Sequence, residues 1–173
     1  MATIYYTASS LDGFIATTDH SLEWLLSRDI DEAGPMHYTA FRERIGASIM
    51  GATTCQWVLD HDDSDQPWGS LPNFVMTHRD FAPVAGTTFT DAPVADVHAQ
   101  ALEVAGGKDV WLVGGGELVG QFFDLGLLDE VWVQYAPCTL GAGAPVLPRA
   151  VELRLEEVAR NRDFACLRHT VVK

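Results

Sequence analysis

The segment Val110–Gly120 constrains the fold most, because it joins a strand to a helix through three consecutive glycines. The four apolar residues before Gly114 are typical of a strand that is covered on both faces. Apolar residues then recur at helical spacing, at Leu118, Val119, Phe122 and Phe123. Glycines let a ligand approach the backbone closely, and the free N–H groups at a helix start favour an anion. The segment therefore predicts a strand-turn-helix unit that binds a phosphate.

The usual dinucleotide-binding pattern does not fit this turn. That pattern would require a third glycine where Val119 stands, and Gly120 comes one residue later. A glycine-rich turn also occurs where a helix merely packs tightly on its strand, so both interpretations stay open on these residues alone.

Two further segments have the composition of an anion site. Gly51, Ala52, Thr53 and Thr54 follow a short apolar strand and precede a helical segment, so glycine and hydroxyls stand at a second strand-to-helix turn. Thr77, His78 and Arg79 end another apolar run and form a polar, cationic group at a strand terminus. A phosphorylated ligand is the first functional expectation.

Length and charge exclude several other classes of protein. The chain has 173 residues, 47% of them hydrophobic, which predicts one globular domain over residues 1–173. Its 24 acidic and 11 basic residues give a formal net charge of −13, which argues against nucleic acid as a partner. No apolar stretch is long enough for a membrane span, and no leader pattern opens the chain, so we expect a cytoplasmic protein.

The three cysteines are far apart, which argues against a disulfide framework or a zinc site. The acidic segment 60–65 lacks the glycine and glutamate of a calcium-binding loop, so we expect no metal.

Along the chain, apolar runs that are typical of strands alternate with helical patterns and end in two long strands. The expected strands are Thr3–Ala8, Ala47–Met50, Phe74–Thr77, Thr87–Thr90, Val110–Val113, Asp129–Tyr135, Leu153–Ala159 and Phe164–Val172. The expected helices are Ser21–Leu26 with Ser21 as its N-cap, a helix from about Pro35 to Gly46, a segment from the turn at Gly51 to Leu59, Val94–Ala105, and the helix after the three glycines. This order predicts an α/β fold with a single central mixed, mostly parallel sheet, flanked by helices on both faces and completed by a C-terminal antiparallel hairpin.

In this order the segments resemble the dihydrofolate reductase-like superfamily, and more closely the branch of the riboflavin-biosynthesis reductases, the RibD C-terminal domain. The resemblance covers nearly the whole chain and rests on four motifs: Ser-Leu-Asp-Gly-Phe-Ile-Ala at 10–16, Ile-Met-Gly-Ala-Thr-Thr at 49–54, Val-Gly-Gly-Gly-Glu-Leu at 113–118, and Thr-Leu-Gly-Ala-Gly-Ala-Pro-Val-Leu-Pro at 139–148.

The resemblance implies that NADPH, or NADH as an alternative, lies across one edge of the sheet. The two glycine turns would hold the pyrophosphate, the 77–79 group would bind the adenosine 2′-phosphate, and a cis bond would join Gly114 to Gly115. The implied cofactor-binding residues are Ala8, Ile15, Ala16, Gly51, Ala52, Thr53, Thr54, Thr77, His78, Arg79, Val113, Gly114, Gly115, Gly116, Glu117, Leu118 and Val119. Many relatives have Arg at the position of Ala52, so selection of the 2′-phosphate would depend on Arg79 and His78.

Asp12 and His37 are the candidate catalytic residues. Asp12 belongs to the first motif, although Asp-Gly is also common in plain turns. His37 stands where folate-reducing members have an acid, and a histidine is able to donate a proton near neutral pH. A structural histidine is the alternative, and Asp31 or Glu32 stay open as acids. Trp24 is the expected substrate contact among Trp24, Trp57 and Trp68, and Phe41 is the second substrate residue.

Together these features predict a reductase that transfers a hydride from NADPH to a pterin, a flavin precursor or a similar small heterocycle. The alternative is a nucleotide- or flavin-binding module of the same fold without turnover. By resemblance we also expect a homodimer, supported by apolar residues on the terminal hairpin.

Overall fold

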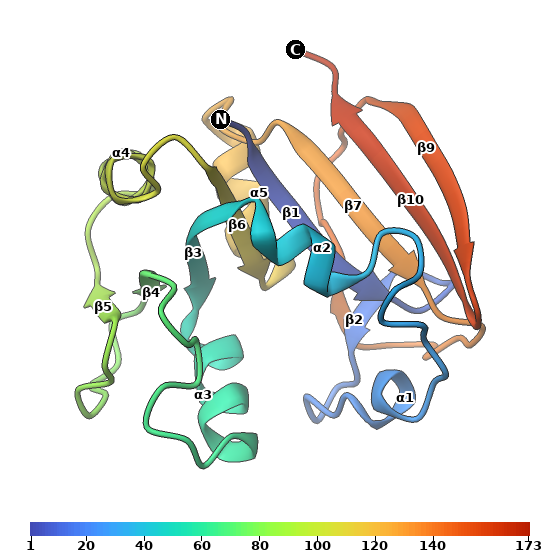
Figure 1. Cartoon of the computed structure of the whole chain (residues 1–173), viewed down its shortest axis with the longest axis horizontal. Coiled ribbons are helices and arrows are strands. Elements are labelled where there is room, and N and C mark those ends of the chain that lie inside the picture. The colour runs from blue at the N-terminus through green and yellow to red at the C-terminus, as the bar shows by residue number, and fades with distance from the viewer.

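An eight-stranded sheet runs through the computed structural model, which describes residues 1–173 (Figure 1). Its strand order is β5-β4-β3-β6-β1-β7-β10-β9. The strands are β1 (Thr3–Ser9), β3 (Ile45–Gly51), β4 (Asn73–Met76), β5 (Thr87–Thr90), β6 (Asp109–Gly114), β7 (Glu130–Tyr135), β9 (Leu153–Asn161) and β10 (Phe164–Val171). The strands from β5 to β7 are parallel, and β10 and β9 are antiparallel. The predicted mostly parallel sheet with a C-terminal hairpin is confirmed.

The remaining elements are five helices and a small antiparallel pair of strands. The helices are α1 (Glu23–Leu26), α2 (Tyr38–Glu43), α3 (Ala52–His61), α4 (Val94–Val104) and α5 (Gly116–Asp124), and the pair is β2 (Phe14–Ala16) with β8 (Ala144–Pro145). None of these helices has both the length and the apolar character that crossing a lipid bilayer requires.

The first two helices are shorter than the sequence predicted, for reasons of local hydrogen bonding. Ser21 is not the N-cap residue, because α1 begins at Glu23 and the N-cap position is Leu22. The Ser21 hydroxyl nevertheless accepts the Glu23 N–H at 3.2 Å. His37 caps α2 through its ring, which accepts the Thr39 N–H. Gly46 lies in β3 and not at a helix end. A Cβ there would be 2.2 Å from the Ala105 carbonyl oxygen, so glycine permits the end of α4 to pack on the strand.

Helices cover both faces of the sheet, as Figure 1 shows. On the α2 face, Ile4 and Tyr6 of β1 pack with Phe41, Trp111 and Trp132, and the rings of Tyr6 and Phe41 are stacked at 4.2 Å. On the opposite face, the side chain of Tyr5 packs among buried residues of α4 and α5, which are Val97, Ala101, Val119 and Phe122. This alternation along β1 is what a strand with two covered faces requires.

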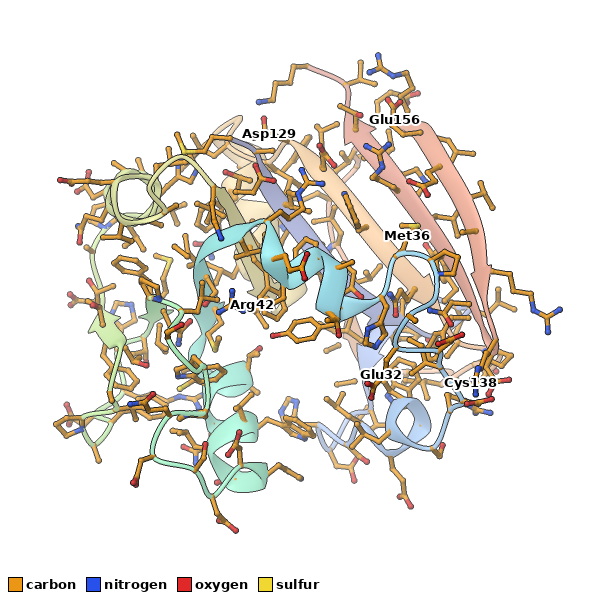
Figure 2. All side chains as sticks on the ribbon, viewed as in Figure 1. Glu32, Met36, Arg42, Asp129, Cys138 and Glu156 are labelled. Atoms are coloured by element: carbon orange, nitrogen blue, oxygen red, sulfur yellow. The ribbon has the colours of Figure 1, made fainter.

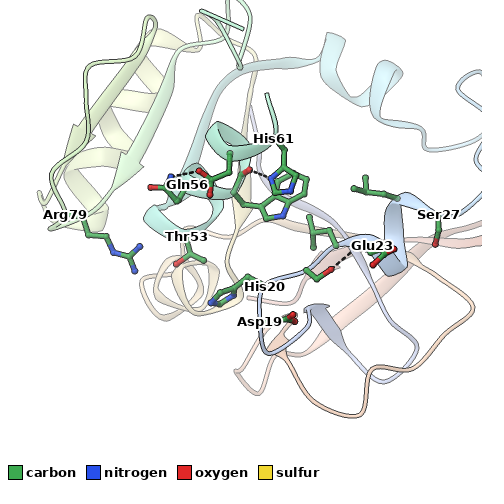
Figure 3. Close-up of a pocket in the computed structure, with 13 residues that line it drawn as sticks. Asp19, His20, Glu23, Ser27, Thr53, Gln56, His61 and Arg79 are labelled. Atoms are coloured by element: carbon green, nitrogen blue, oxygen red, sulfur yellow. Dashed lines mark hydrogen bonds between the residues drawn. The ribbon is translucent and has the colours of Figure 1, made fainter. Parts of the chain in front are cut away.

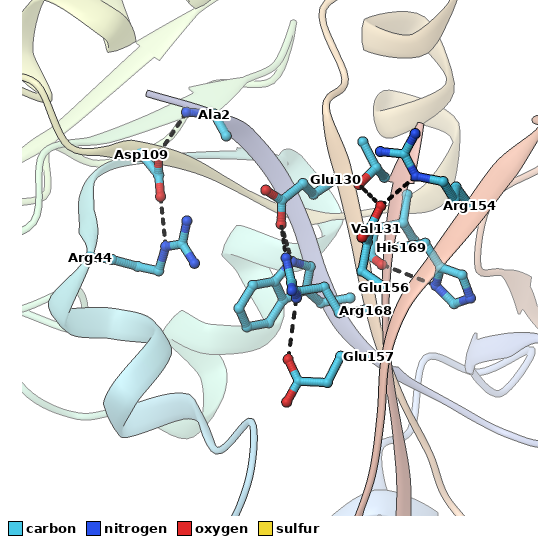
Figure 4. A network of polar contacts seen from close by, with 12 residues as sticks. Ala2, Arg44, Asp109, Glu130, Val131, Arg154, Glu156, Glu157, Arg168 and His169 are labelled. Atoms are coloured by element: carbon cyan, nitrogen blue, oxygen red, sulfur yellow. Dashed lines mark hydrogen bonds and ion pairs between the residues drawn. The ribbon is translucent and has the colours of Figure 1, made fainter. Parts of the chain in front are cut away.

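At the edge where the parallel strands begin, the polar groups are paired with one another (Figure 4). The Asp109 carboxylate accepts the Arg44 Nε–H and the Ala2 N–H, both at 2.6 Å. Asp129 accepts the Thr3 N–H at 2.8 Å and the Lys173 ammonium at 2.7 Å. We call this the amino edge, where Asp109 and Asp129 connect the start of the chain to Arg44 and Lys173.

The C-terminal hairpin extends the sheet well beyond the helices. The Arg168 guanidinium lies over the Trp132 ring at 5.6 Å and pairs with Glu157 at 3.3 Å, which joins β7, β10 and β9 on one face. Leu155 and Val158 on β9 are 53% and 64% exposed. Below the hairpin, the Gln134 amide donates to the Met36 carbonyl at 2.6 Å, and Met36 lies beside these strands in Figure 2.

Candidate functional site

The two predicted glycine turns adjoin at the opposite edge of the sheet, which we call the carboxyl edge. β3 and β6 are neighbouring parallel strands, so the residues that follow them emerge side by side. A Cβ on Gly51 would lie 3.9 Å from the Gly114 carbonyl oxygen and 4.0 Å from the Gly115 nitrogen. A Cβ on Gly114 would lie 3.9 Å from the Thr54 hydroxyl. The turns at 51–54 and 114–119 therefore form one continuous surface, which we call the glycine notch.

The three glycines of the second turn differ in their surroundings. The bond between Gly114 and Gly115 is cis, as the resemblance implied, and Gly114 has a φ of +136° that favours glycine. A Cβ on Gly115 would meet nothing within 4 Å, so this residue borders open space. A Cβ on Gly116 would lie 2.3 Å and 2.5 Å from the backbone oxygens of Pro145 and Val146. Gly115 is thus open to a ligand, whereas Gly116 is required for packing.

Two helices begin at the glycine notch, and neither has a side-chain N-cap. Gly51 is the N-cap residue of α3 and Gly115 that of α5, so no side chain accepts the first N–H groups of either helix. The first N–H groups of a helix have no acceptor within the helix and carry a partial positive charge. A diphosphate fits this donor set, because the open space at Gly115 leaves room for its oxygens.

The third predicted segment lies at the end of β4, two strands from β6. The Thr77 hydroxyl accepts the Arg79 N–H at 2.8 Å, which fixes the backbone of the segment. The exposed Arg79 guanidinium pairs with no carboxylate, and His78 lies 4.0 Å from Asp91. Arg79 is therefore free to bind an anion brought to this edge.

A cleft of about 810 Å³ opens between residues 19–27 and helix α3 (Figure 3). Arg79 stands at one side of it and Glu23 and Ser27 at the other, with Thr53 and Gln56 of α3 between them. The complete lining is Asp19, His20, Ser21, Leu22, Glu23, Leu26, Ser27, Thr53, Gln56, Trp57, Asp60, His61 and Arg79. Thr53 belongs both to this lining and to the glycine notch, so the cleft adjoins the expected cofactor site.

An aromatic pair forms part of the cleft wall. The rings of Trp57 and His61, one helical turn apart on α3, are stacked at 4.1 Å with an interplanar angle of 14°. His61 Nδ1 is 2.7 Å from the Trp57 carbonyl oxygen, which fixes the imidazole on the indole. The pair presents flat apolar surface of the kind on which a planar ring stacks.

Phe41 is not a substrate contact, and this expectation is corrected. Its side chain is 2% exposed and packs among Tyr6, Trp111 and Trp132 in the core of the α2 face. Phe41 lies on the face of α2 that packs on the sheet, so its position is determined by core packing and not by contact with a substrate.

Trp24 is likewise placed away from the cleft. It packs against Ala136, Phe164 and Cys166 at the base of the hairpin, while its neighbours Leu22, Glu23 and Leu26 line the cleft. Of the three tryptophans that the sequence offered, Trp57 is the one in the lining. Its spacing of four residues from Thr53, on the helix after the first turn, is the signal that would have identified it.

Asp12, an expected catalytic residue, joins two loops by hydrogen bonds. Its carboxylate accepts the Ser10 hydroxyl at 2.6 Å, the Leu140 N–H at 3.0 Å and the Gly141 N–H at 2.7 Å. The Ser10 hydroxyl and then these backbone donors lower the pKa of the Asp12 carboxyl below its usual value. An acid held in its ionised form is a poor proton donor, and here it joins the first loop to the loop at 138–143.

His37, Asp31 and Glu32, the other candidates for the proton donor, also lie outside the cleft lining. The His37 ring caps α2, as described above, and it belongs to the structural alternative. Asp31 accepts the Ala33 N–H at 3.0 Å within a turn, and Glu32 is exposed. The acidic and imidazole groups that line the cleft are instead Asp19, His20, Glu23, Asp60 and His61, none of which was a candidate.

The remaining predicted cofactor residues lie in β1, β2, β6 and α5. Ala8 is in β1, Ile15 and Ala16 are in β2, and Val113 is the second-last residue of β6, all of them half-buried. Val119 is fully buried, and the Glu117 carboxylate pairs with Arg149 at 2.8 Å, so on α5 these side chains serve packing and pairing. Leu118 packs against the core behind the notch. The cofactor contacts that we expect from α5 are thus made by its backbone.

Comparisons with known proteins agree with this geometry. The family model of the RibD C-terminal domain matches residues 2–163. The Bacillus subtilis protein YwjB is 28% identical over 165 residues, which cover 89% of this chain and 88% of YwjB. The riboflavin biosynthesis protein RibD of Corynebacterium ammoniagenes is 26% identical over 150 residues, which cover 81% of this chain but 44% of that longer protein.

Solved structures have the same fold. A Shewanella sp. PV-4 protein assigned to riboflavin biosynthesis superposes over 100% of both chains with a TM-score of 0.83 and 25% identity. A Thermotoga maritima deaminase/reductase, whose reductase is named for 5-amino-6-(5-phosphoribosylamino)uracil, matches 99% of this chain and 56% of its own length, with a TM-score of 0.65 and 15% identity. The fold, the paired glycine turns and the family match together show that this chain belongs to the RibD C-terminal domain family, within the dihydrofolate reductase-like fold.

Proposed function

We propose that the chain is an NADPH-dependent reductase that transfers a hydride to a small flat heterocycle, a pterin, a flavin precursor or a similar ring. The observation that carries this proposal is the glycine notch, where two uncapped helix starts meet with open space at Gly115. Such a notch is an anion site, and its position between two parallel strands at the carboxyl edge is the usual place for a ligand in this class of sheet.

Each part of the edge has a separate task in this proposal. The backbone N–H groups of α3 and α5 hold the diphosphate, and Arg79 binds the 2′-phosphate together with the Thr77 hydroxyl and His78. Bound NADPH supplies the hydride. The Trp57 and His61 pair orients the acceptor ring in the adjoining cleft, which raises the rate by positioning.

The relatives support the reaction class. RibD of Corynebacterium ammoniagenes is named for riboflavin biosynthesis, and the Thermotoga maritima protein is named as a reductase of a substituted uracil. Both names concern flat nitrogen heterocycles, which agrees with the aromatic wall of this cleft.

Cofactor binding tests the proposal directly. Titration of NADPH into the chain is expected to quench tryptophan fluorescence, because Trp57 lies in the cleft beside Thr53. Arg79→Gln is expected to weaken NADPH binding by about tenfold to a hundredfold, the effect of losing a charge-assisted hydrogen bond, and to leave NADH binding unchanged. Arg154→Gln on the distant strand β9 is the matched control. An NADPH affinity that does not respond to Arg79→Gln would contradict the assigned 2′-phosphate site.

A second function, a nucleotide- or flavin-binding module without turnover, is favoured by one observation. Neither Asp12 nor His37 lines the cleft, so neither expected proton donor is in place. The loss of nicotinamide absorbance with pterins and flavin precursors distinguishes the two functions, because a module would bind NADPH without oxidising it.

The expected homodimer stays a prediction, and we propose that it forms on the hairpin. Leu155 and Val158 are the large exposed apolar residues of β9, an edge strand with unpaired backbone groups. Sedimentation velocity of the wild type and of Leu155→Glu measures the oligomeric state, and we expect the substitution to yield a monomer. A dimer that survives the substitution would place the interface elsewhere.

A further inference from the structure

We infer that the substrate part of the cleft selects against phosphorylated compounds and accepts an uncharged or cationic flat ring, with Glu23 as one specificity-determining residue. This inference rests on the proposed function, because it assigns the cleft to the substrate and the glycine notch to NADPH. It separates this chain from the Thermotoga maritima reductase, whose named substrate carries a phosphate.

The charges of the lining are unequal. Asp19, Glu23 and Asp60 supply three carboxylates, and Arg79 is the one arginine or lysine among the thirteen lining residues. Asp19 and Glu23 come from the segment that forms one wall, and Asp60 comes from α3 in the other wall. A phosphate ester entering between these walls would therefore meet negative charge on both sides.

None of the three carboxylates is neutralised by an ion pair. Asp19 accepts the Thr17 hydroxyl, which lowers the pKa of its carboxyl and keeps it ionised. Asp60 accepts only the neutral Gln56 amide, at 2.8 Å. Glu23 forms no salt bridge and stands in the lining across from Arg79 (Figure 3). The field of these carboxylates thus remains in the cleft, and the net charge of −13 adds to it.

The one cation of the lining is already assigned. Arg79 follows β4 and stands on the Thr53 side of the cleft, where the proposal gives it to the cofactor. The free N–H groups of α3 and α5 belong to the diphosphate for the same reason. Once NADPH is bound, no arginine or lysine of the lining remains for a phosphate on the substrate.

The aromatic pair explains why the cleft accepts a flat ring. Trp57 and His61 offer stacking surface, and stacking requires a planar ring but no phosphate. The hydroxyls of Ser21 and Ser27 and the Gln56 amide are neutral groups that suit ring substituents or a sugar.

Riboflavin and riboflavin 5′-phosphate are a suitable probe pair, because they share one ring system and differ by the phosphate. We expect the NADPH-saturated chain to bind riboflavin about tenfold more tightly at low salt and about pH 8, above the usual titration range of histidine. The difference should shrink as salt is added, since screening weakens the repulsion. Flavin fluorescence quenching measures both affinities.

Charge reversal at Glu23 tests the assigned residue. Glu23→Lys is expected to remove or invert the preference, and Glu23→Gln to reduce it by an intermediate amount. Glu103→Lys, an equal change of charge on the exposed side of α4, is the matched control and should leave the ratio near its wild-type value. Circular dichroism of each variant verifies that the fold is retained.

The outcomes separate the inference from the proposed function. Equal affinities, tighter binding of the phosphorylated flavin, no binding of either flavin, or a ratio that responds equally to Glu103→Lys would each overturn the selection while NADPH binding stands. A chain that does not bind NADPH at all would overturn the proposed function first, and this is measured before any flavin is added.

Discussion

The two edges of the central sheet differ in how far their polar groups are paired with one another. At the amino edge, Asp109 and Asp129 each contact a cation and a backbone N–H. At the carboxyl edge, α3 and α5 begin without side-chain caps and Arg79 has no carboxylate partner. The polar groups of the amino edge are therefore satisfied by one another, whereas the carboxyl edge retains hydrogen-bond donors without a protein partner.

The unpaired donors at the carboxyl edge indicate where folding stability is lower so that a ligand is able to bind. Paired groups satisfy one another and fix the start of β1 and β6, whereas uncapped helix ends forgo the stabilisation that a cap provides. Substitutions at the two edges should consequently separate the free energy of unfolding from cofactor affinity.

Gly116→Ala is expected to have the largest effect. The added Cβ would lie 2.3 Å and 2.5 Å from the backbone oxygens of Pro145 and Val146. Backbone atoms, unlike the end of a flexible side chain, cannot move away without shifting the chain. We expect a loss of about 3 kcal/mol or more in the free energy of unfolding, measured by urea denaturation.

Gly51→Ala is the matched control at the same edge. Its Cβ would make only ordinary contacts at 3.9 Å and 4.0 Å, and its φ is −88°, so most of the stability should be retained. NADPH affinity should nevertheless fall about tenfold, because the methyl group projects into the glycine notch. If Gly51→Ala binds NADPH as the wild type does, the notch is not where the diphosphate lies.

Asp109→Asn at the amino edge should show the opposite pattern. It removes a charge-assisted pair with Arg44 at 2.6 Å, with an expected cost of about 2 kcal/mol in unfolding free energy. NADPH affinity, measured by fluorescence titration of the folded variant, should not change. A parallel loss of affinity would mean that the two edges are coupled.

Asp12→Asn should have the smallest effect, and one that depends on pH. The pKa of Asp12 is lower in the folded chain than in the unfolded chain, so its stabilisation is complete above the usual aspartate range and is lost as pH falls through the folded pKa. The wild type should therefore unfold at higher urea than Asp12→Asn at about pH 7, and the difference between their midpoints should shrink as the pH falls below about 4. A constant difference across this range would contradict an ionic role.

The architecture could be predicted because local pattern and turn chemistry agree with it. The triple glycine predicted the second turn and, through the family resemblance, the cis bond at Gly114. Neighbouring parallel strands then place the two turns side by side, so that a Cβ on Gly51 would lie 3.9 Å from the Gly114 carbonyl oxygen. This contact between Gly51 and Gly114, 63 positions apart in sequence, follows from the sheet topology.

The side chains of the cleft could not be predicted in the same way. Phe41 and Trp57 are both aromatic residues on amphipathic segments, and only the sheet beneath α2 decides that Phe41 is buried. Trp24 differs from Glu23 and Leu26, in the same four-residue helix, in the direction in which the helix points its side chain. Such directions depend on packing between segments, on which a single sequence has no information.

The central position of β1 has a consequence for how the chain acquires its fold. Thr3 pairs with Val110 and Ile4 with Glu130, so the first strand to be synthesised finds both neighbours only after more than a hundred residues have followed. High contact order of this kind slows folding, because the entropy of closing a long loop is lost before the contacts form. On the ribosome β1 therefore has both edges unpaired until β6 and β7 emerge, and an unpaired strand edge is prone to aggregation.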